Sequence, residues 1–291
     1  MSVSRRRFVK TTAAGALGAT AGISSPARGA FAFPGGEREE AAEALKLGVA
    51  SYSLREFPRA RAIEMTRELR TTYINLKSFH LPYEATPEEL AAARREIEAA
   101  GLTIVGGGTI TFENDTDEDV RKYFEYARGA GMPLIVATSE PATLPRIERF
   151  AKQYDIKVAI HNHGPEDQHF PSPYDALGHV KDMDPRMGLC IDVGHTVRTG
   201  TDVVQAIADT GPRLLDMHAK DLRDLKSAES QCIIGEGAMP FPDIFRQLQA
   251  MGYSGCVNLE YEIDADDPLP GMKQSFAYMR GVLAGLAAPQ G

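Results

Sequence analysis

The chain has 291 residues, of which 43% are hydrophobic and 25% are charged. This is an ordinary globular composition, and it excludes a disordered, collagen-like or coiled-coil protein. With 32 Lys and Arg against 40 Asp and Glu, the formal net charge is −8, which argues against a nucleic-acid-binding surface because such surfaces are normally basic. Three cysteines are too sparse, and odd in number, for a disulfide framework.

Residues 1–32 have the order of parts of an export signal. Basic residues come first, an uncharged Ala- and Gly-rich stretch follows, and Ala30-Phe31-Ala32 is typical of a cleavage site. The segment Ser4-Arg5-Arg6-Arg7-Phe8 resembles a twin-arginine signal. We therefore expect export through the twin-arginine machinery to the periplasm, cleavage near residue 32, and a linker over residues 33–45. No stretch is long and apolar enough to predict stable membrane insertion.

From residue 46 onward, short apolar runs alternate with amphipathic stretches. The apolar runs predict strands at 47–52, 73–77, 102–105, 133–137, 157–160, 188–191, 214–217 and 256–259. The amphipathic stretches predict helices near 59–71, 87–100, 117–129, 142–154, 172–181, 201–210, 241–251 and 270–285. Pro87 at the start of one helix and Gly101 just after its end are the expected helix punctuation.

Eight strand–helix units indicate an α/β fold. Strands that are apolar along their whole length are buried on both faces, as in a parallel sheet. We therefore expect a single (β/α)8 TIM barrel over residues 46–288. An open doubly wound sheet is the alternative, but the first strand–helix turn lacks its glycine fingerprint. The run Gly106-Gly107-Gly108 is interpreted as a flexible turn, or as bare backbone that leaves room for substrate.

Imidazoles and carboxylates follow four consecutive predicted strands. The segments are His161-Asn162-His163, Asp192-Val193-Gly194-His195, His218-Ala219-Lys220-Asp221 and Glu260-Tyr261-Glu262. Chemistry in a TIM barrel sits at the C-terminal ends of its strands, so these side chains can converge at one rim. A mixed imidazole and carboxylate set suits Mn, Co, Fe or Zn better than Ca or Mg. The pattern therefore predicts one divalent metal site.

The same segments carry a resemblance to a known group of proteins. Together with Gly235-Glu236-Gly237 and Met251-Gly252-Tyr253, they resemble the xylose isomerase-like TIM barrel superfamily, and within it the sugar phosphate isomerase/epimerase group. The resemblance implies one divalent cation, often Mn, held by His161, Asp192, His218 and Glu260. It also implies that His195 binds substrate hydroxyls and that Lys220 is a basic substrate contact.

One position departs from the ketose epimerases of that group, which carry a glutamate where this chain has His161. A metal-bound imidazole cannot also accept a proton, so a symmetrical pair of carboxylate bases is not available. Glu260, or its neighbour Glu262, remains as the carboxylate base. His163 is the candidate for the second acid or base, and otherwise a hydrogen-bonding contact. His80, at the end of the second strand, and Glu262 are candidate substrate contacts.

These observations predict a metal-dependent isomerase or epimerase. It would act on an unphosphorylated carbohydrate or cyclitol by removing a proton next to a carbonyl. The first alternative is a dehydratase or lyase that uses the same enolate, and the second is a barrel that binds metal and sugar without turnover. An endonuclease IV-like role is disfavoured by the acidic charge and the export signal. The sugar, the metal and the oligomeric state are left open.

Overall fold

The computed structural model describes residues 45–288. The predicted signal peptide, and the predicted linker except for Leu45, lie outside the described residues. No helix in residues 45–288 is long and apolar enough to cross a membrane. The three cysteines are buried free thiols.

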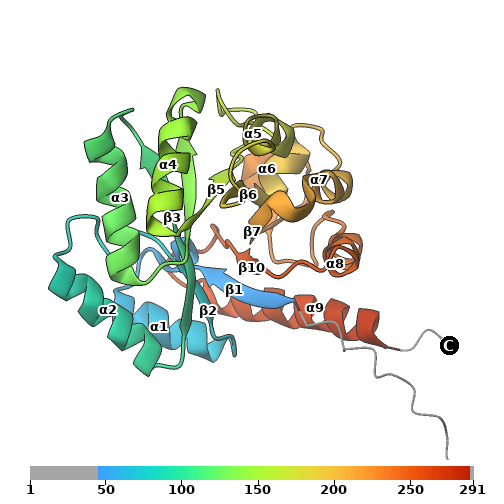
Figure 1. Ribbon diagram of the computed structural model, residues 1–291. Coiled ribbons are helices and arrows are strands. Elements are labelled where there is room, and N and C mark those ends of the chain that lie inside the picture. Colours follow the sequence, from blue (N-terminus) through green and yellow to red (C-terminus); the bar gives the residue numbers. More distant parts are fainter. Residues whose placement is uncertain (1–44, 289–291) are drawn as a thin grey trace, which may run out of the picture. The chain divides into compact units, whose positions relative to one another are not determined.

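Eight parallel strands close into a barrel in the order β1-β10-β7-β6-β5-β4-β3-β2 (Figure 1). They are β1 (Lys46–Ala50), β2 (Tyr73–Leu76), β3 (Thr103–Phe112), β4 (Leu134–Ser139), β5 (Lys157–His161), β6 (Met187–Asp192), β7 (Leu214–Ala219) and β10 (Cys256–Leu259). Closure through the pairing of β1 with β10 confirms the predicted TIM barrel and excludes the open doubly wound sheet.

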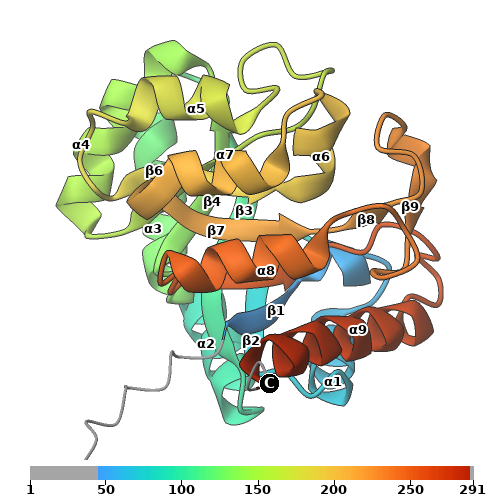
Figure 2. The same ribbon diagram turned by 90° about the vertical axis from the view of Figure 1, so that its right-hand side faces the viewer.

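Helices surround the barrel and alternate with its strands. They are α1 (Arg59–Glu68), α2 (Pro87–Ala99), α3 (Asp117–Ala130), α4 (Leu144–Tyr154), α5 (Pro173–Val180), α6 (Val193–Arg198), α7 (Val203–Thr210), α8 (Phe241–Ala250) and α9 (Leu269–Ala287). Neighbouring helices pack against one another around the outside, as α8 and α9 do in Figure 2. Most of the buried apolar side chains lie in one continuous core.

Local chemistry explains where several helices begin and end. The Thr86 hydroxyl accepts the backbone N–H of Glu89, whose carboxylate accepts the N–H of Thr86, so α2 begins with a capping box. The Thr116 hydroxyl caps α3 in a similar way by accepting the N–H of Asp119. At the other end of α3, Gly131 has φ of 72°, a conformation that costs glycine little.

Three features differ from the sequence prediction. The six-residue helix α6 and a hairpin of β8 (Asp221–Leu222) with β9 (Gln231–Cys232) were not predicted. The run Gly106–Gly108 is part of β3 and not a turn. Close packing explains why glycines occupy this strand, because a Cβ on Gly107 would lie 2.3 Å from the Met132 sulfur. Without Cβ atoms, these residues let neighbouring parts of the same chain pack closely against the strand.

The barrel interior changes from apolar to polar across its width. Leu134, Val136, Ala159 and Cys190 form a small apolar cluster. Beside it the Asp216 carboxylate accepts hydrogen bonds from the side-chain amides of Asn258, at 2.7 Å, and Asn75, at 3.2 Å. Burial raises the pKa of Asp216 to about 6. Part of the barrel interior is therefore a hydrogen-bonded polar layer.

Candidate metal centre

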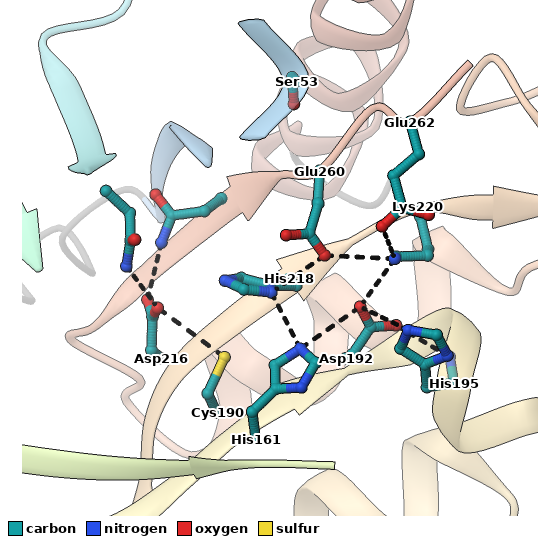
Figure 3. Close-up of polar contacts among 12 residues, drawn as sticks. Ser53, His161, Cys190, Asp192, His195, Asp216, His218, Lys220, Glu260 and Glu262 are labelled. Carbon is teal, nitrogen blue, oxygen red and sulfur yellow. Dashed lines mark hydrogen bonds and ion pairs between the residues drawn. The ribbon is translucent and has the colours of Figure 1, made fainter. Parts of the chain in front are cut away.

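Side chains from four neighbouring strands meet inside the barrel at the C-terminal ends of the strands (Figure 3). They are His161 at the end of β5, Asp192 at the end of β6, His218 in β7 and Glu260 directly after β10. The register between β6 and β7 brings two of these side chains together, because Asp192 lies directly opposite His218. One possible ligand atom from each residue lies within 4.8 Å of the other three, and all four residues are buried.

The nitrogen and oxygen atoms of this cluster face one another. His161 Nε2 lies 3.1 Å from His218 Nδ1 and 3.8 Å from Asp192 Oδ2. His218 Nδ1 lies 3.2 Å from Glu260 Oε2. Burial, together with the neighbouring His218, lowers the pKa of His161 well below its usual range. A neutral imidazole is the form that binds a metal ion.

The two carboxylate oxygens of Asp192 have different partners. Oδ1 accepts the backbone N–H of His195 at 2.8 Å and so caps α6. Oδ2 is buried and accepts no hydrogen bond from the described residues; its partner is the ammonium of Lys220, which lies 3.1 Å away in an ion pair. This oxygen therefore has lone pairs left for a further ligand. Two imidazoles and two carboxylates fit a divalent transition-metal ion, with Asp192 Oδ2 as one of the two oxygen ligands.

Two buried lysines balance the charge of the carboxylates. Lys220 Nζ lies 3.2 Å from Glu260 Oε2, and Lys77 Nζ lies 3.2 Å from Glu260 Oε1. Burial alone would raise the pKa of Glu260, but His218, Lys77 and Lys220 hold it well below its usual range. Burial alone would lower the pKa of Lys220, but Asp192, Glu260 and Glu262 hold it well above its usual range. Glu260 is therefore ionised.

Lys77 and Asn162 belong to the site but were not singled out from the sequence. Lys77 directly follows β2, and its position at a strand end was the available signal. The Asn162 side chain accepts the backbone N–H of Asp192 at 3.0 Å and donates to Thr196 Oγ1 at 3.1 Å. Asn162 thus ties the end of β5 to the end of β6. A lone asparagine carries no sequence signal for that role.

A small polar pocket of about 260 Å³ opens above the cluster. It is lined by Tyr52, Lys77, Ser78, Phe79, Thr109, His161, His163, Glu260 and Glu262. The Phe79 side chain is 58% exposed, and its ring packs edge-on against Tyr52 with 5.7 Å between ring centroids. A larger cavity of about 610 Å³ lies at the opposite mouth, among the first residues of the strands. In TIM barrels the C-terminal end carries the chemistry, so the smaller pocket is the candidate active site.

The structure places the remaining predicted contacts at different depths. The His163 ring is exposed and lies 4.6 Å, between centroids, from the ring of His195. Burial lowers the pKa of His195 to about 4. Glu262 lines the pocket and accepts a hydrogen bond from Lys220 at 2.9 Å.

His80 is placed away from these groups. Its side chain is 2% exposed, and it is not among the residues that line the pocket. One ring nitrogen, Nδ1, lies 2.9 Å from the Ser51 hydroxyl, and the other, Nε2, lies 3.1 Å from the carbonyl oxygen of Leu54. Both ring nitrogens therefore have partners inside the fold, and His80 stabilises the loop after β2.

Comparison with known proteins supports the resemblance drawn from the motifs. The family described as Xylose isomerase-like TIM barrel matches residues 142–282, just under half of the chain. That segment contains all four residues of the cluster. The chain is also similar to a D-psicose 3-epimerase structure, with a TM-score of 0.67 and 18% identity over 83% of this chain and 100% of the other. At this identity the similarity shows the fold alone.

Two curated proteins align with parts of the chain. Uncharacterized protein MJ1311 of Methanocaldococcus jannaschii is 28% identical over 130 residues, which is 41% of each chain. An inosose dehydratase of Clostridium beijerinckii is 24% identical over 216 residues, which is 68% of each chain. The chain thus spans about two fifths of the length of the first relative and about two thirds of the second.

Proposed function

We propose that this protein is a metal-dependent enzyme that removes a proton next to a carbonyl group of an unphosphorylated sugar or cyclitol. The observation that carries the proposal is the buried group of two imidazoles and two carboxylates, of which His161 and Glu260 line a small polar pocket. None of the described residues that line that pocket is an arginine, the side chain best suited to bind a phosphate. Its volume of about 260 Å³ suits a molecule the size of a single sugar ring.

His161, Asp192, His218 and Glu260 would hold the ion, and we propose Mn because imidazole and carboxylate ligands together suit it. A divalent ion in this position would act as a Lewis acid on a carbonyl oxygen. The ammonium groups of Lys77 and Lys220 lie within 3.2 Å of Glu260. They add fixed positive charge beside the place where an enolate oxygen would form.

The proton acceptor is a carboxylate at the end of β10. Glu260 is ionised but is surrounded by Lys77, Lys220 and His218, and a carboxylate with a strongly lowered pKa is a weak base. The Glu262 side chain is 38% exposed and lines the pocket. Glu262 is therefore a second candidate for the base, next to the ligand Glu260.

The asymmetry of the acid and base groups favours elimination. Strand β5 ends at His161, which belongs to the cluster, and His163 in the loop after it lines the pocket; neither is a carboxylate. One carboxylate with one exposed imidazole suits removal of a proton at one carbon and protonation of a leaving group at the next. Similarity to an inosose dehydratase supports the same reaction class. Isomerisation or epimerisation, in which the proton returns to carbon, is the second candidate.

The test combines a substrate panel with two matched variants. Free aldoses, ketoses, 3-keto sugars and inososes would be incubated with the Mn²⁺-supplied protein in D2O. Elimination yields an unsaturated product with loss of water or an alcohol, whereas an isomerase or epimerase places deuterium next to the carbonyl. If neither kind of product forms with any member of the panel, the result contradicts the proposed enzyme and favours a binding protein.

Glu260→Gln and Glu262→Gln separate the ligand from the base. Glu260→Gln should lower both metal content and rate, because Glu260 offers a ligand oxygen. Glu262→Gln should keep the metal and, if Glu262 is the base, lower kcat about 10²–10⁴-fold. Full activity of Glu262→Gln would assign the base to Glu260. Metal content measured by elemental analysis decides between the two roles.

A further inference from the structure

Arg198, the last residue of α6, packs against the imidazole of His195. The Arg198 side chain is only 6% exposed, and its Nη1 lies 3.0 Å from His195 Nδ1. Its other terminal nitrogen, Nη2, donates to Glu166 Oε1. Neither Arg198 nor Glu166 has a place in the cluster or in the pocket lining described above.

This contact determines which nitrogen of His195 carries the proton. A guanidinium group has N–H donors and no acceptor. The Nδ1 atom that it contacts must therefore accept, so in the neutral ring the proton is on Nε2. A doubly protonated ring would place its Nδ1–H against an N–H of Arg198, and two positive charges would meet in a largely buried position.

The protonated nitrogen faces the candidate metal centre. His195 Nε2 lies 4.0 Å from Asp192 Oδ2, while the backbone N–H of His195 donates to the other oxygen of the same carboxylate at 2.8 Å. Figure 3 shows His195 beside Asp192, on the far side of that carboxylate from His161. The proton on Nε2 therefore faces the Asp192 side of the site. His195 is not among the residues that line the pocket, but its side chain is 13% exposed and its ring lies 4.6 Å from that of His163, which does line the pocket.

A glycine makes room for the arginine and histidine to meet. Gly164 has φ of +89°, and a Cβ built on it would lie 3.0 Å from Arg198 Nη1 and 3.2 Å from His195 Nδ1. A side chain there would press between the two groups in a backbone conformation that L-residues rarely adopt. The loop after β5 is therefore shaped around the contact between Arg198 and His195.

We propose that Arg198 is a positioning residue that fixes His195 as an Nε2–H hydrogen-bond donor to a substrate oxygen. With Nδ1 occupied by Arg198 and Nε2 carrying the proton, neither ring nitrogen can accept the substrate proton. The remaining candidates for proton transfer to and from the substrate are then Glu260, Glu262 and His163. Which substrate oxygen accepts the hydrogen bond from His195 rests on the proposed function. Which ring nitrogen of His195 carries the proton does not.

The experiment reads the protonation of His195 directly. Histidine rings labelled with nitrogen-15 report, in long-range proton–nitrogen correlation spectra, which nitrogen carries the proton. The protein is supplied with diamagnetic Zn²⁺, and His195 is assigned by the signals that disappear in His195→Gln. The wild type should show a bare Nδ1 and a protonated Nε2. A proton on Nδ1 of the wild type overturns the proposal.

Variants of Arg198 test the cause. Arg198→Met should populate the Nδ1–H form, and with an active substrate kcat/KM should fall about 2- to 10-fold, the range for one neutral hydrogen bond. Arg198→Lys keeps a donor and should keep the wild-type spectrum. Arg213→Met is the matched control, because Arg213 also bonds through its guanidinium, but to backbone carbonyls such as that of Met187 at 2.8 Å. It should leave the His195 signals unchanged.

A second variant covers the case in which Arg198→Met does not fold. Gly164→Ala should move the guanidinium by a few tenths of an ångström and so weaken its contact with His195, which should raise the Nδ1–H population above that of the wild type. Wild-type signals in a folded Arg198→Met variant, or a proton on Nδ1 of the wild type itself, would overturn the proposal. The expected proton positions in a protein without turnover on any substrate would support this assignment and contradict the proposed enzyme activity.

Discussion

His80 shows how a histidine at a strand end can serve the fold. The backbone N–H of Lys77 donates to the Ser51 hydroxyl at 2.8 Å, and that hydroxyl can in turn donate to His80 Nδ1, while Nε2–H donates to the carbonyl of Leu54. These hydrogen bonds suit a neutral ring, and burial lowers the pKa of His80, which disfavours the charged form. The same hydrogen bonds connect His80 through Ser51 to the backbone of Lys77, a residue of the candidate site.

The neutral state of His80 makes stability depend on pH. Burial lowers the pKa of His80 from its usual value near 6.5, so the unfolded chain binds a proton more readily than the native chain. The stabilisation is complete above about pH 6.5 and is lost as the pH falls below it. We expect the free energy of unfolding, measured in urea at several pH values, to fall less steeply with acid in His80→Gln than in the wild type.

The control for this prediction is the exposed His169. His169→Gln should follow the wild-type pH dependence, because the His169 side chain is exposed and folding does not bury it. Parallel curves for His80→Gln and the wild type would contradict a neutral, hydrogen-bonded His80. Other buried histidines contribute equally to both proteins and cancel in the comparison.

At the scale of elements, periodicity predicted the barrel because each strand is apolar along its length and each helix is amphipathic. The β1–β10 pairing that closes the barrel follows from having eight such units. The helix α6 was missed because its six residues are fewer than two turns and it starts on the Asp192 cap. The Asp192 cap is local, since it accepts the N–H three residues further on, but a helix this short has no periodic pattern by which to recognise it.

The loop between β7 and α8 was also beyond prediction, because one buried carboxylate organises it from a distance. Asp221 Oδ2 accepts the backbone N–H groups of Gly235 and Gly237, at 2.8 and 3.2 Å. Its Oδ1 accepts those of Leu222 and Met239, at 2.9 and 3.0 Å. The sequence contains the Asp221 and Gly235-Glu236-Gly237 segments, but their contact appears only in the fold.

Removing the Asp221 carboxylate should therefore cost much of the stability. Asp221→Ala leaves four backbone N–H groups without this acceptor, and we expect the free energy of unfolding to fall by roughly 3–5 kcal/mol. Asp224→Ala is the control, since Asp224 is exposed and accepts the N–H of Lys226 at 3.0 Å. Denaturant unfolding measures both. A loss below about 1 kcal/mol for Asp221→Ala would contradict this role.

At the scale of the whole molecule, a metal ion bound by four strands should stabilise the entire barrel. An ion that binds only the native state adds about 2.7 kcal/mol at a concentration of 100 times its Kd. For a domain of this size that is roughly 5–10 °C in Tm. We expect EDTA to lower the Tm by this amount and Mn²⁺ to restore it.

Two variants make the chelation result specific to the cluster. Asp192→Ala should melt at a temperature that EDTA does not change, because the variant lacks the ligand oxygen. Asp216→Asn changes a carboxylate of the neighbouring polar layer that is not part of the four-residue group and should still respond to EDTA. An unchanged Tm of the wild type in EDTA would contradict the metal site.

The export prediction concerns the part of the chain outside the described residues. Ser4-Arg5-Arg6-Arg7-Phe8 and the uncharged stretch after it resemble a twin-arginine signal, a pathway that carries folded proteins. A protein whose candidate metal ligands come from β5, β6, β7 and the end of β10 would have to fold before it could hold an ion. Loading in the cytoplasm followed by export of the folded chain would satisfy this order.

Replacing Arg5 and Arg6 with lysine should leave the precursor inside the cell, while the wild type should appear in the periplasm shortened by about 32 residues. Cell fractionation with mass spectrometry of the N-terminus measures both, and an intact wild-type chain retained in the cytoplasm would show that the segment is not an export signal.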